Sequence, residues 1–133
     1  MKYMLDTNIC IYVIKKKPKK VIRHLQGLSP YDVCISSITL SELEYGVEKS
    51  ERRDRNKVAL AKFIAPLEVI AYDDMAAGQY GKIRSSLEKK GRLIGALDML
   101  IAAHALSQGL ILVTNNEREF KRVRGIKIEN WAE

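Results

Sequence analysis

The chain has 133 residues, of which 47% are hydrophobic, and this length and composition suit one folded domain over residues 1–133. Its 23 lysines and arginines outnumber its 16 aspartates and glutamates, and the net charge of +7 favours a polyanionic partner such as nucleic acid. The composition excludes a disordered or repetitive chain, and no apolar run is long enough to cross a bilayer, so we expect a cytoplasmic protein that does not bind membranes.

Strand-like and helix-like patterns alternate along the chain. Short apolar runs predict strands at residues 2–5, 33–36, 67–71 and 110–114, with a fifth at 126–128. Helical patterns fall between them, at residues 9–14, 18–25, 39–46, 57–64, 73–91 and 95–108. This alternation is typical of an α/β fold, a doubly wound parallel sheet of four to five strands with helices on both faces. In such sheets ligands bind at the carboxyl ends of the strands, so we expect the site there.

The positive charge is concentrated in four runs, within residues 15–20, 52–57, 89–92 and 118–124. A single run of this kind is usually a solvated helix face or loop. Because there are several of them, we expect an electrostatic role in which basic side chains contact the phosphates of a nucleic acid. The candidate contacts are Lys15, Lys16, Lys17, Arg92 and Arg118.

Two acidic residues follow expected strands, and each has a structural alternative. Asp6 directly follows the first strand and could instead cap the next helix, although Thr7 and Asn8 could do the same. Glu42 comes six residues after the second strand, and Thr39 to Glu42 match a capping box, in which the glutamate bonds back to the helix start. Taken alone, Glu42 is better explained as a capping residue, and Asp6 is explained equally well either way.

Asp98 is the sharpest functional signal in the chain. It lies near the start of a helical pattern, residues 95–108, that is otherwise apolar apart from His104. A buried carboxylate is costly unless it is paired or binds a cation, and no basic residue follows at helical spacing. The alternative is a first-turn acid that the helix dipole stabilises. We favour a functional role for Asp98 and interpret His104, which lies off its helix face, as a core histidine.

The chain lacks the patterns of several common catalytic and metal sites. It has no histidine pair at zinc spacing, no serine nucleophile motif and no glycine-rich phosphate loop. The two cysteines, Cys10 and Cys34, lie in apolar runs, and we expect them to be reduced core residues. Oxygen ligands remain, and carboxylates at the edge of a parallel sheet suit Mg²⁺ or Mn²⁺.

Four segments of the sequence resemble a known family. They are MLDTN at 4–8, SSITLSELEYG at 36–46, GRLIGALD at 91–98 and LVTNNEREF at 112–120. In their order and spacing they are similar to the PIN-domain toxins of VapBC toxin–antitoxin systems, over essentially the whole chain. The resemblance implies a doubly wound α/β fold and an endoribonuclease that depends on Mg²⁺ or Mn²⁺. It also implies a homodimer that a cognate VapB-type antitoxin holds inactive, in some cases within a larger hetero-oligomer.

The resemblance also implies roles for individual residues. The metal-binding aspartates of the family fall on Asp6 and Asp98, and its helix-borne acid falls on Glu42. Asn116 replaces a fourth acid of some relatives, so Glu119 becomes the nearest candidate for that position, and the number of metal ions stays open. Relatives with two asparagines here resemble toxins that cut transfer RNA in the anticodon loop, often the initiator, which is the substrate we expect.

We therefore expect metal-assisted hydrolysis of RNA phosphodiesters, with Asp6, Glu42 and Asp98 as the catalytic residues. Asp6 and Asp98 would hold the cation, while Glu42 orients or deprotonates water or holds a second ion. The residues expected to orient these carboxylates are Thr7, Thr114, Asn115 and Asn116.

Two other functions stay open at the level of sequence. A phosphoacceptor signalling module of the flavodoxin-like fold would use Asp6 together with Asp73 and Asp74. It also needs a lysine near the end of the last core strand, where this chain has Thr114 and Asn115. The other alternative is a catalytically inactive RNA-binding protein.

Overall fold

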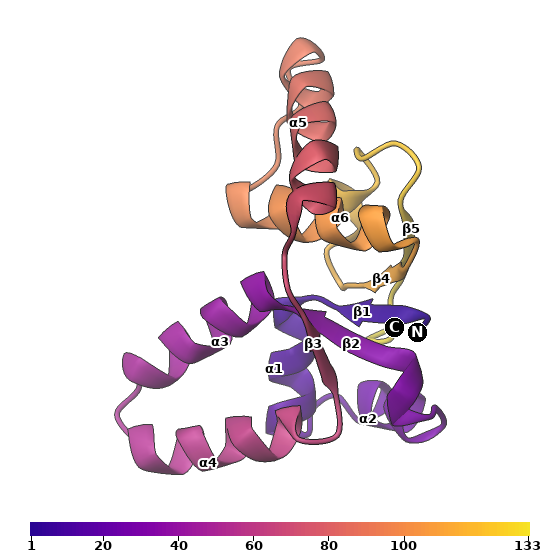
Figure 1. Cartoon of the computed structure of the whole chain (residues 1–133). Helices are drawn as coiled ribbons and strands as arrows, with labels where there is room; N and C mark the ends of the chain where they lie inside the picture. Colours follow the sequence, from indigo (N-terminus) through magenta and orange to yellow (C-terminus); the bar gives the residue numbers. More distant parts are fainter.

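A computed structural model describes the whole chain, Met1–Glu133, and shows helices packed on both sides of a central sheet (Figure 1). None of its helices has the length and apolar character needed to cross a membrane. The elements in chain order are β1 (Tyr3–Leu5), α1 (Thr7–Lys15), α2 (Lys19–Gln26), a short 3₁₀ helix (Pro30–Asp32), β2 (Val33–Ser36), α3 (Ser37–Glu48), α4 (Arg53–Ile64), β3 (Glu68–Ile70), α5 (Asp74–Lys89), α6 (Ala96–Gln108), β4 (Ile111–Val113), α7 (Glu117–Phe120) and β5 (Lys127–Glu129).

The strands form one sheet in the order β3-β2-β1-β4-β5, and every neighbouring pair is parallel. β1 is the central strand, with Met4 opposite Cys34 of β2 and Leu112 of β4. The carboxyl ends of these strands therefore meet at one edge of the sheet. The doubly wound parallel sheet that the sequence pattern predicts is confirmed.

The strand order contradicts the flavodoxin-like alternative, because that fold has the order 2-1-3-4-5. Asp73, which that alternative needs as an acidic partner, has a structural role instead. It is the N-cap of α5, and its carboxylate accepts a 3.0 Å hydrogen bond from the backbone amide of Ala76. Asp74 is the first residue of the same helix.

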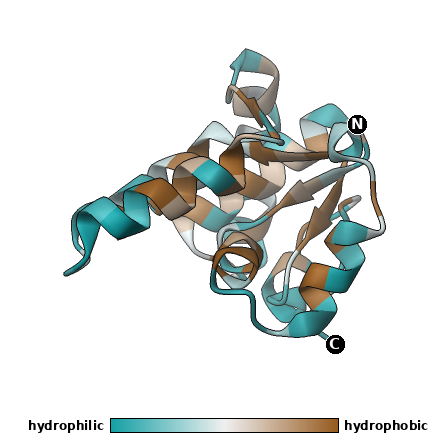
Figure 2. Ribbon diagram, turned by 90° about the horizontal axis from the view of Figure 1, so that it is seen from below, coloured by the Kyte–Doolittle hydropathy of each residue, from teal (hydrophilic) through white to brown (hydrophobic).

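Strand side chains alternate between two cores, one on each face of the sheet. On one face, Met4, Cys34 and Leu112 pack against residues of α5 and α6. On the other face, Leu5 and Ile35 pack against residues of α1, α2, α3 and α4. Figure 1 shows α5 and α6 above the strands and α1 and α2 below them, and Figure 2 shows hydrophobic colouring concentrated in the strands. Both cysteines, Cys10 and Cys34, are buried and unpaired, as predicted.

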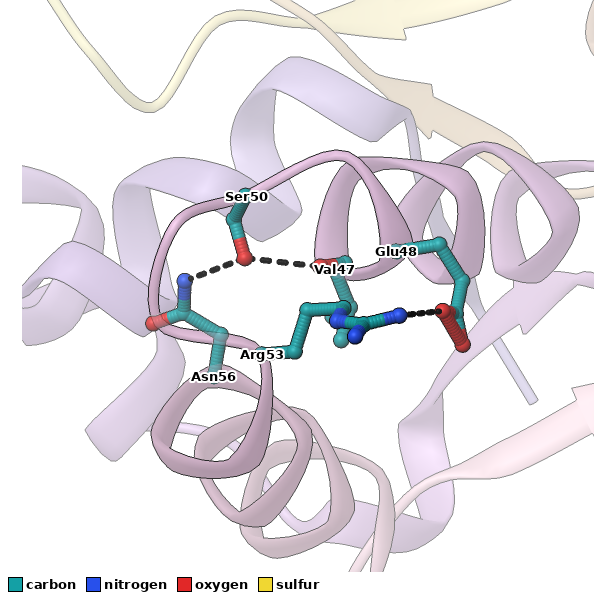
Figure 3. A network of polar contacts seen from close by, with 5 residues as sticks. All are labelled: Val47, Glu48, Ser50, Arg53 and Asn56. Carbon is teal, nitrogen blue, oxygen red and sulfur yellow. Dashed lines mark hydrogen bonds and ion pairs between the residues drawn. The ribbon is translucent and has the colours of Figure 1, made fainter.

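α3 and α4 form an antiparallel pair that a small polar network joins at the turn between them (Figure 3). The Ser50 hydroxyl donates a 2.7 Å hydrogen bond to the carbonyl of Val47, and the Asn56 amide donates one of 3.0 Å to the Ser50 hydroxyl. Arg53 of α4 also forms an ion pair with Glu48 of α3, at 3.5 Å. These contacts hold α4 beside α3, the helix that carries Glu42.

The observed boundaries differ from the sequence prediction, and three of the differences bear on the site. α1 begins at Thr7, directly after Asp6 and two residues before the expected start at residue 9. α3 begins at Ser37, because the Ser36 hydroxyl caps it by accepting a 3.0 Å hydrogen bond from the Ile38 amide. The sequence pattern did not predict the short helix α7. The second difference changes the interpretation of Glu42, and the third places Glu119.

Candidate active site

Asp6 lies directly after the central strand β1, where it caps a helix and is also a candidate catalytic residue. It is the N-cap of α1, where one carboxylate oxygen, Oδ1, accepts a 2.9 Å hydrogen bond from the amide of Ile9. The residue is only 5% exposed. Burial raises the pKa of Asp6, and hydrogen bonding to Thr114 opposes that rise. Asp6 therefore does cap α1, through its Oδ1. The fully buried Thr114 also hydrogen-bonds to the Asp6 carboxyl group.

Glu42 does not cap a helix, so the capping-box interpretation is wrong. α3 starts at Ser37, which places Glu42 in the second turn, beyond the reach of the helix start. Its Oε1 instead accepts a 2.7 Å hydrogen bond from the hydroxyl of Thr7, the first residue of α1. The contact joins the helices that follow β1 and β2. It holds the Glu42 carboxylate at the edge of the sheet where Asp6 also lies.

Asp98 lies in the first turn of α6 and is half-buried beside other acids. Its pKa is raised to about 6, first by burial, then by the negative charges of Glu119, Asp6 and Glu42 and by hydrogen bonding to Glu119. The carboxylates of three helices, α3, α6 and α7, and of the central strand's end thus act on one another electrostatically. We refer to Asp6, Glu42, Asp98 and Glu119 as the acidic site.

Gly95 leaves the space that the Asp98 carboxylate occupies. A Cβ atom at Gly95 would lie 3.3 Å from Oδ2 of Asp98, tighter than an ordinary van der Waals contact. Gly95 is also the N-cap of α6, and its carbonyl accepts a 2.9 Å hydrogen bond from the amide of Met99. The absence of a side chain here therefore keeps one side of the Asp98 carboxylate open.

The polar residues after β4 make hydrogen bonds to two kinds of partner, carboxylates of the acidic site and a tyrosine of α1. The Asn116 amide donates a 3.1 Å hydrogen bond to Oε2 of Glu119, and the backbone amide of Asn116 bonds to the Thr114 hydroxyl at 2.9 Å. Asn115 instead donates to the phenol oxygen of Tyr12, at 2.8 Å, and its own Oδ1 is buried without a partner. Thr114 therefore contacts Asp6, Asn116 contacts Glu119 and none of the three carboxylates it was expected to orient, and the hydrogen bonds of Asn115 include no carboxylate.

No cation of the protein neutralises the acidic site. The ion pairs of the chain are Arg53 with Glu48 and Arg84 with Glu88, and both lie elsewhere. Unpaired carboxylates of this kind are the donors that divalent cations such as Mg²⁺ bind in proteins. As placed, no three carboxylate, histidine or cysteine side chains converge closely enough to hold one ion. The site thus supplies suitable oxygen donors without presenting a preassembled set of three ligands.

The basic residues chosen from the sequence fall in different places. Lys15 lines a groove with Glu42, between α1, α3 and α4, whereas Lys16 lines a separate depression between α1 and α4. Lys17 is exposed and lines neither of these hollows. Arg92 and Arg118 come from separate segments but line a single depression. Within the run at Lys15–Lys17, only Lys15 therefore shares a hollow with Glu42, while Arg92 and Arg118 line the same depression as each other.

His104 is a core histidine, as predicted. It is fully buried, and its Nδ1 lies 2.7 Å from the Ser36 hydroxyl. Burial lowers the pKa of His104, which favours the neutral ring.

The residue that sequence reasoning missed is Tyr12, which holds Asn115. Its position inside the apolar stretch of α1 gives no functional signal. The short helix α7, which carries Glu119, did have a signal in the sequence. Glu117 and Glu119 are acids in its first turn, a pattern typical of helix starts.

Comparison with known proteins identifies the family to which this fold and this acidic edge belong. A model of the PIN domain family matches residues 3–126. Among curated relatives, the tRNA(fMet)-specific endonuclease VapC proteins of Salmonella typhimurium and Shigella flexneri are 52% and 49% identical to this chain over 132 residues, and each match covers 99% of both chains. The parallel α/β fold with an acidic edge is thus that of a PIN domain, and the chain belongs to this family, among the VapC toxins of VapBC toxin–antitoxin systems.

Solved structures give the same result. VapBC of Salmonella typhimurium bound to DNA matches with a TM-score of 0.93 and 52% identity, covering 98% of each chain. VapBC2 of Rickettsia felis bound to a promoter DNA fragment matches with a TM-score of 0.93 and 44% identity, covering 98% of this chain and 99% of that one.

Proposed function

We propose that this protein is the toxin of a type II toxin–antitoxin system and acts as a metal-dependent endoribonuclease on transfer RNA. The observation that carries the proposal is the acidic site, a set of mutually repelling carboxylates with no protein cation, at the carboxyl edge of a PIN-domain sheet. The names of the similar VapC proteins, tRNA(fMet)-specific endonuclease and ribonuclease, support the reaction and the substrate class.

The residues of the acidic site have distinct roles in this proposal. Asp6 and Asp98 would hold Mg²⁺ or Mn²⁺, and Glu119 is the candidate for a further ligand. When bound there, such a cation would supply Lewis-acid chemistry toward the scissile phosphate and would lower the pKa of water. Glu42 orients or deprotonates the attacking water, and the hydrogen bond from Thr7 fixes its carboxylate for that task. Asp98 must be ionised to bind the cation, so its raised pKa in the metal-free site makes protons compete with the cation at low pH.

The substrate assignment is tested with end-labelled initiator and elongator transfer RNAs. We expect a single cut in the anticodon loop of the initiator and slower cleavage of the elongator. Sequencing the product ends identifies the bond. Equal cleavage of both RNAs would contradict the initiator assignment, and binding without cleavage under all metal conditions would favour the inactive RNA-binding alternative.

A VapB-type antitoxin is the proposed partner, since the matched solved structures are VapBC complexes. The groove beside Glu42 is mostly apolar, with lining residues such as Ile11, Leu43 and Leu60, and suits an apolar segment of that partner. An antitoxin arginine would pair with the acidic site. We also propose that the toxin forms a homodimer. Co-expression with the adjacent small gene should yield a complex without nuclease activity, and full activity in that complex would contradict the assignment.

A further inference from the structure

A second charged feature, with the opposite sign, is built from the two chain segments that also carry Asp98 and Glu119. Five basic side chains surround one surface depression, and they come from the end of α5, the segment after it, and α7 with the residues that follow. We call this feature the basic depression. Its lining residues are Leu87, Lys90, Arg92, Arg118, Lys121 and Arg122.

The positive charges of the basic depression have no carboxylate partner. The three nearest acids along the chain bond elsewhere: Glu88 pairs with Arg84 at 2.8 Å, Glu117 accepts from Asn130 at 3.1 Å, and Glu119 accepts from Asn116 at 3.1 Å. No ion pair of the protein includes a residue of the depression. Like charges held this close repel one another, so an anion bound among them would relieve the repulsion.

The basic depression is tied to the acidic site by the backbone. The guanidinium of Arg122 is half-buried, and its Nη1 donates a 3.1 Å hydrogen bond to the carbonyl of Leu93. This bond fastens the segment leading to Asp98 onto the end of α7. Arg92 therefore lies on the chain that carries Asp98, and Arg118 is the neighbour of Glu119. The basic depression and two members of the acidic site thus belong to the same two chain segments.

We propose that the basic depression binds a phosphate of the substrate strand away from the bond that is cut. This inference rests on the proposed ribonuclease function and adds an anchoring subsite to it. One divalent cation offsets only two of the four carboxylate charges, so the acidic site stays net negative toward the phosphates that flank the cut bond, and cations on another surface add the attraction that holds the strand. Arginine suits this task, because its planar guanidinium matches the oxygens of a phosphate in a bidentate contact.

The test compares two charge-matched double variants. Arg92→Gln/Arg118→Gln removes two cations from the depression, while Lys2→Gln/Lys127→Gln removes two exposed cations from the amino ends of β1 and β5, at the opposite edge of the sheet. Each is made in the wild-type chain for cleavage and in an Asp98→Asn chain for binding without cleavage. The probe is a synthetic initiator-tRNA anticodon stem-loop, and circular dichroism checks folding.

We expect Arg92→Gln/Arg118→Gln to raise the Kd roughly tenfold, because charge-assisted hydrogen bonds to the phosphate are removed. It should also flatten the plot of log K against log salt by about 0.7 for each phosphate that is no longer neutralised. Lys2→Gln/Lys127→Gln should change the Kd far less. If both double variants change the Kd equally while the wild type still cleaves RNA, the phosphate subsite is overturned and the proposed function is not. If the wild type does not cleave RNA, the proposed function itself is overturned. If Arg92→Gln/Arg118→Gln does not fold, the exposed pair Lys90→Gln/Lys121→Gln replaces it under the same criteria.

Discussion

The hydroxyl of Thr7 donates a 2.7 Å hydrogen bond to Oε1 of Glu42, and so joins two helices whose contacting residues are 35 positions apart. Thr7 begins α1 and Glu42 lies in α3, so the bond fixes the carboxylate relative to the end of the central strand. Removing the Thr7 hydroxyl therefore tests the role proposed for Glu42.

Thr7→Val should lower RNA cleavage by about 10- to 100-fold, as expected when a carboxylate is no longer held in its orientation by a neighbour. The protein should stay folded, because valine keeps the shape of threonine. Thr7→Ser restores a hydroxyl and should recover most of the activity. Cleavage rates measured at saturating metal provide the comparison, and a Thr7→Val protein as active as Thr7→Ser would show that the bond is not needed.

Asp6 should show separate effects on stability and on activity. Asp6→Asn keeps a good N-cap residue for α1, whereas Asp6→Ala loses the hydrogen bond to the Ile9 amide. Both variants should be inactive, and Asp6→Ala should be less stable than Asp6→Asn by about 1 kcal/mol. Urea unfolding of the metal-free proteins measures this difference. Equal stabilities would mean that the cap contributes little to α1.

Gly95→Ala should reduce activity without strain in the backbone. The backbone angles at Gly95, φ −54° and ψ 145°, are open to alanine, but the new methyl group would lie 3.3 Å from Oδ2 of Asp98. The carboxylate must then move, and the apparent affinity for Mn²⁺ should fall. Metal titration of activity tests this, with Gly46→Ala as a control, because a Cβ there meets nothing within 4 Å. Identical metal titrations would contradict the steric role of Gly95.

The acid limb of activity should depend on Glu119. Burial and then the charge of Glu119 raise the pKa of Asp98, to about 6. Removing that charge in Glu119→Gln lowers the pKa of Asp98. Loss of a candidate ligand also lowers the maximal activity, so each pH profile at subsaturating metal is normalised to its own plateau, and the midpoint of the acid limb should then lie at lower pH than in the wild type. Glu117→Gln is the matched control, because Glu117 bonds to Asn130 instead. A pH profile that moves equally in both variants, or upwards in Glu119→Gln, would exclude this coupling.

Much of the fold could be predicted from the sequence, because it depends on local patterns. The strand at Val33–Ser36 and the apolar helix α6 are evident from runs of hydrophobic residues. Asp98 is evident in the same way, as a carboxylate out of place in an apolar helix. The helix α7 spans only Glu117–Phe120, which is too short to show a helical period.

The contacts within the site could not be predicted, because they join residues far apart in the chain. The pattern at Thr39 to Glu42 satisfied the capping box, yet the hydroxyl of Ser36 is the cap, and a local pattern does not decide between nearby hydroxyls. The bond from Thr7 to Glu42 depends on how two helices lie at the end of a parallel sheet. The pairing of Asn115 with Tyr12 likewise links α1 to the end of β4.

Cleavage of labelled initiator transfer RNA with increasing Mn²⁺ tests the central claim most directly, using the wild type and the Asp98→Asn variant. We predict that the wild type cuts the RNA only when the metal is present and stops in excess EDTA. Asp98→Asn, which keeps the shape of the side chain but not its charge, should bind the RNA and leave it intact. Cleavage by the wild type in excess EDTA, or undiminished cleavage by a folded Asp98→Asn protein, would contradict a metal-dependent reaction at the acidic site.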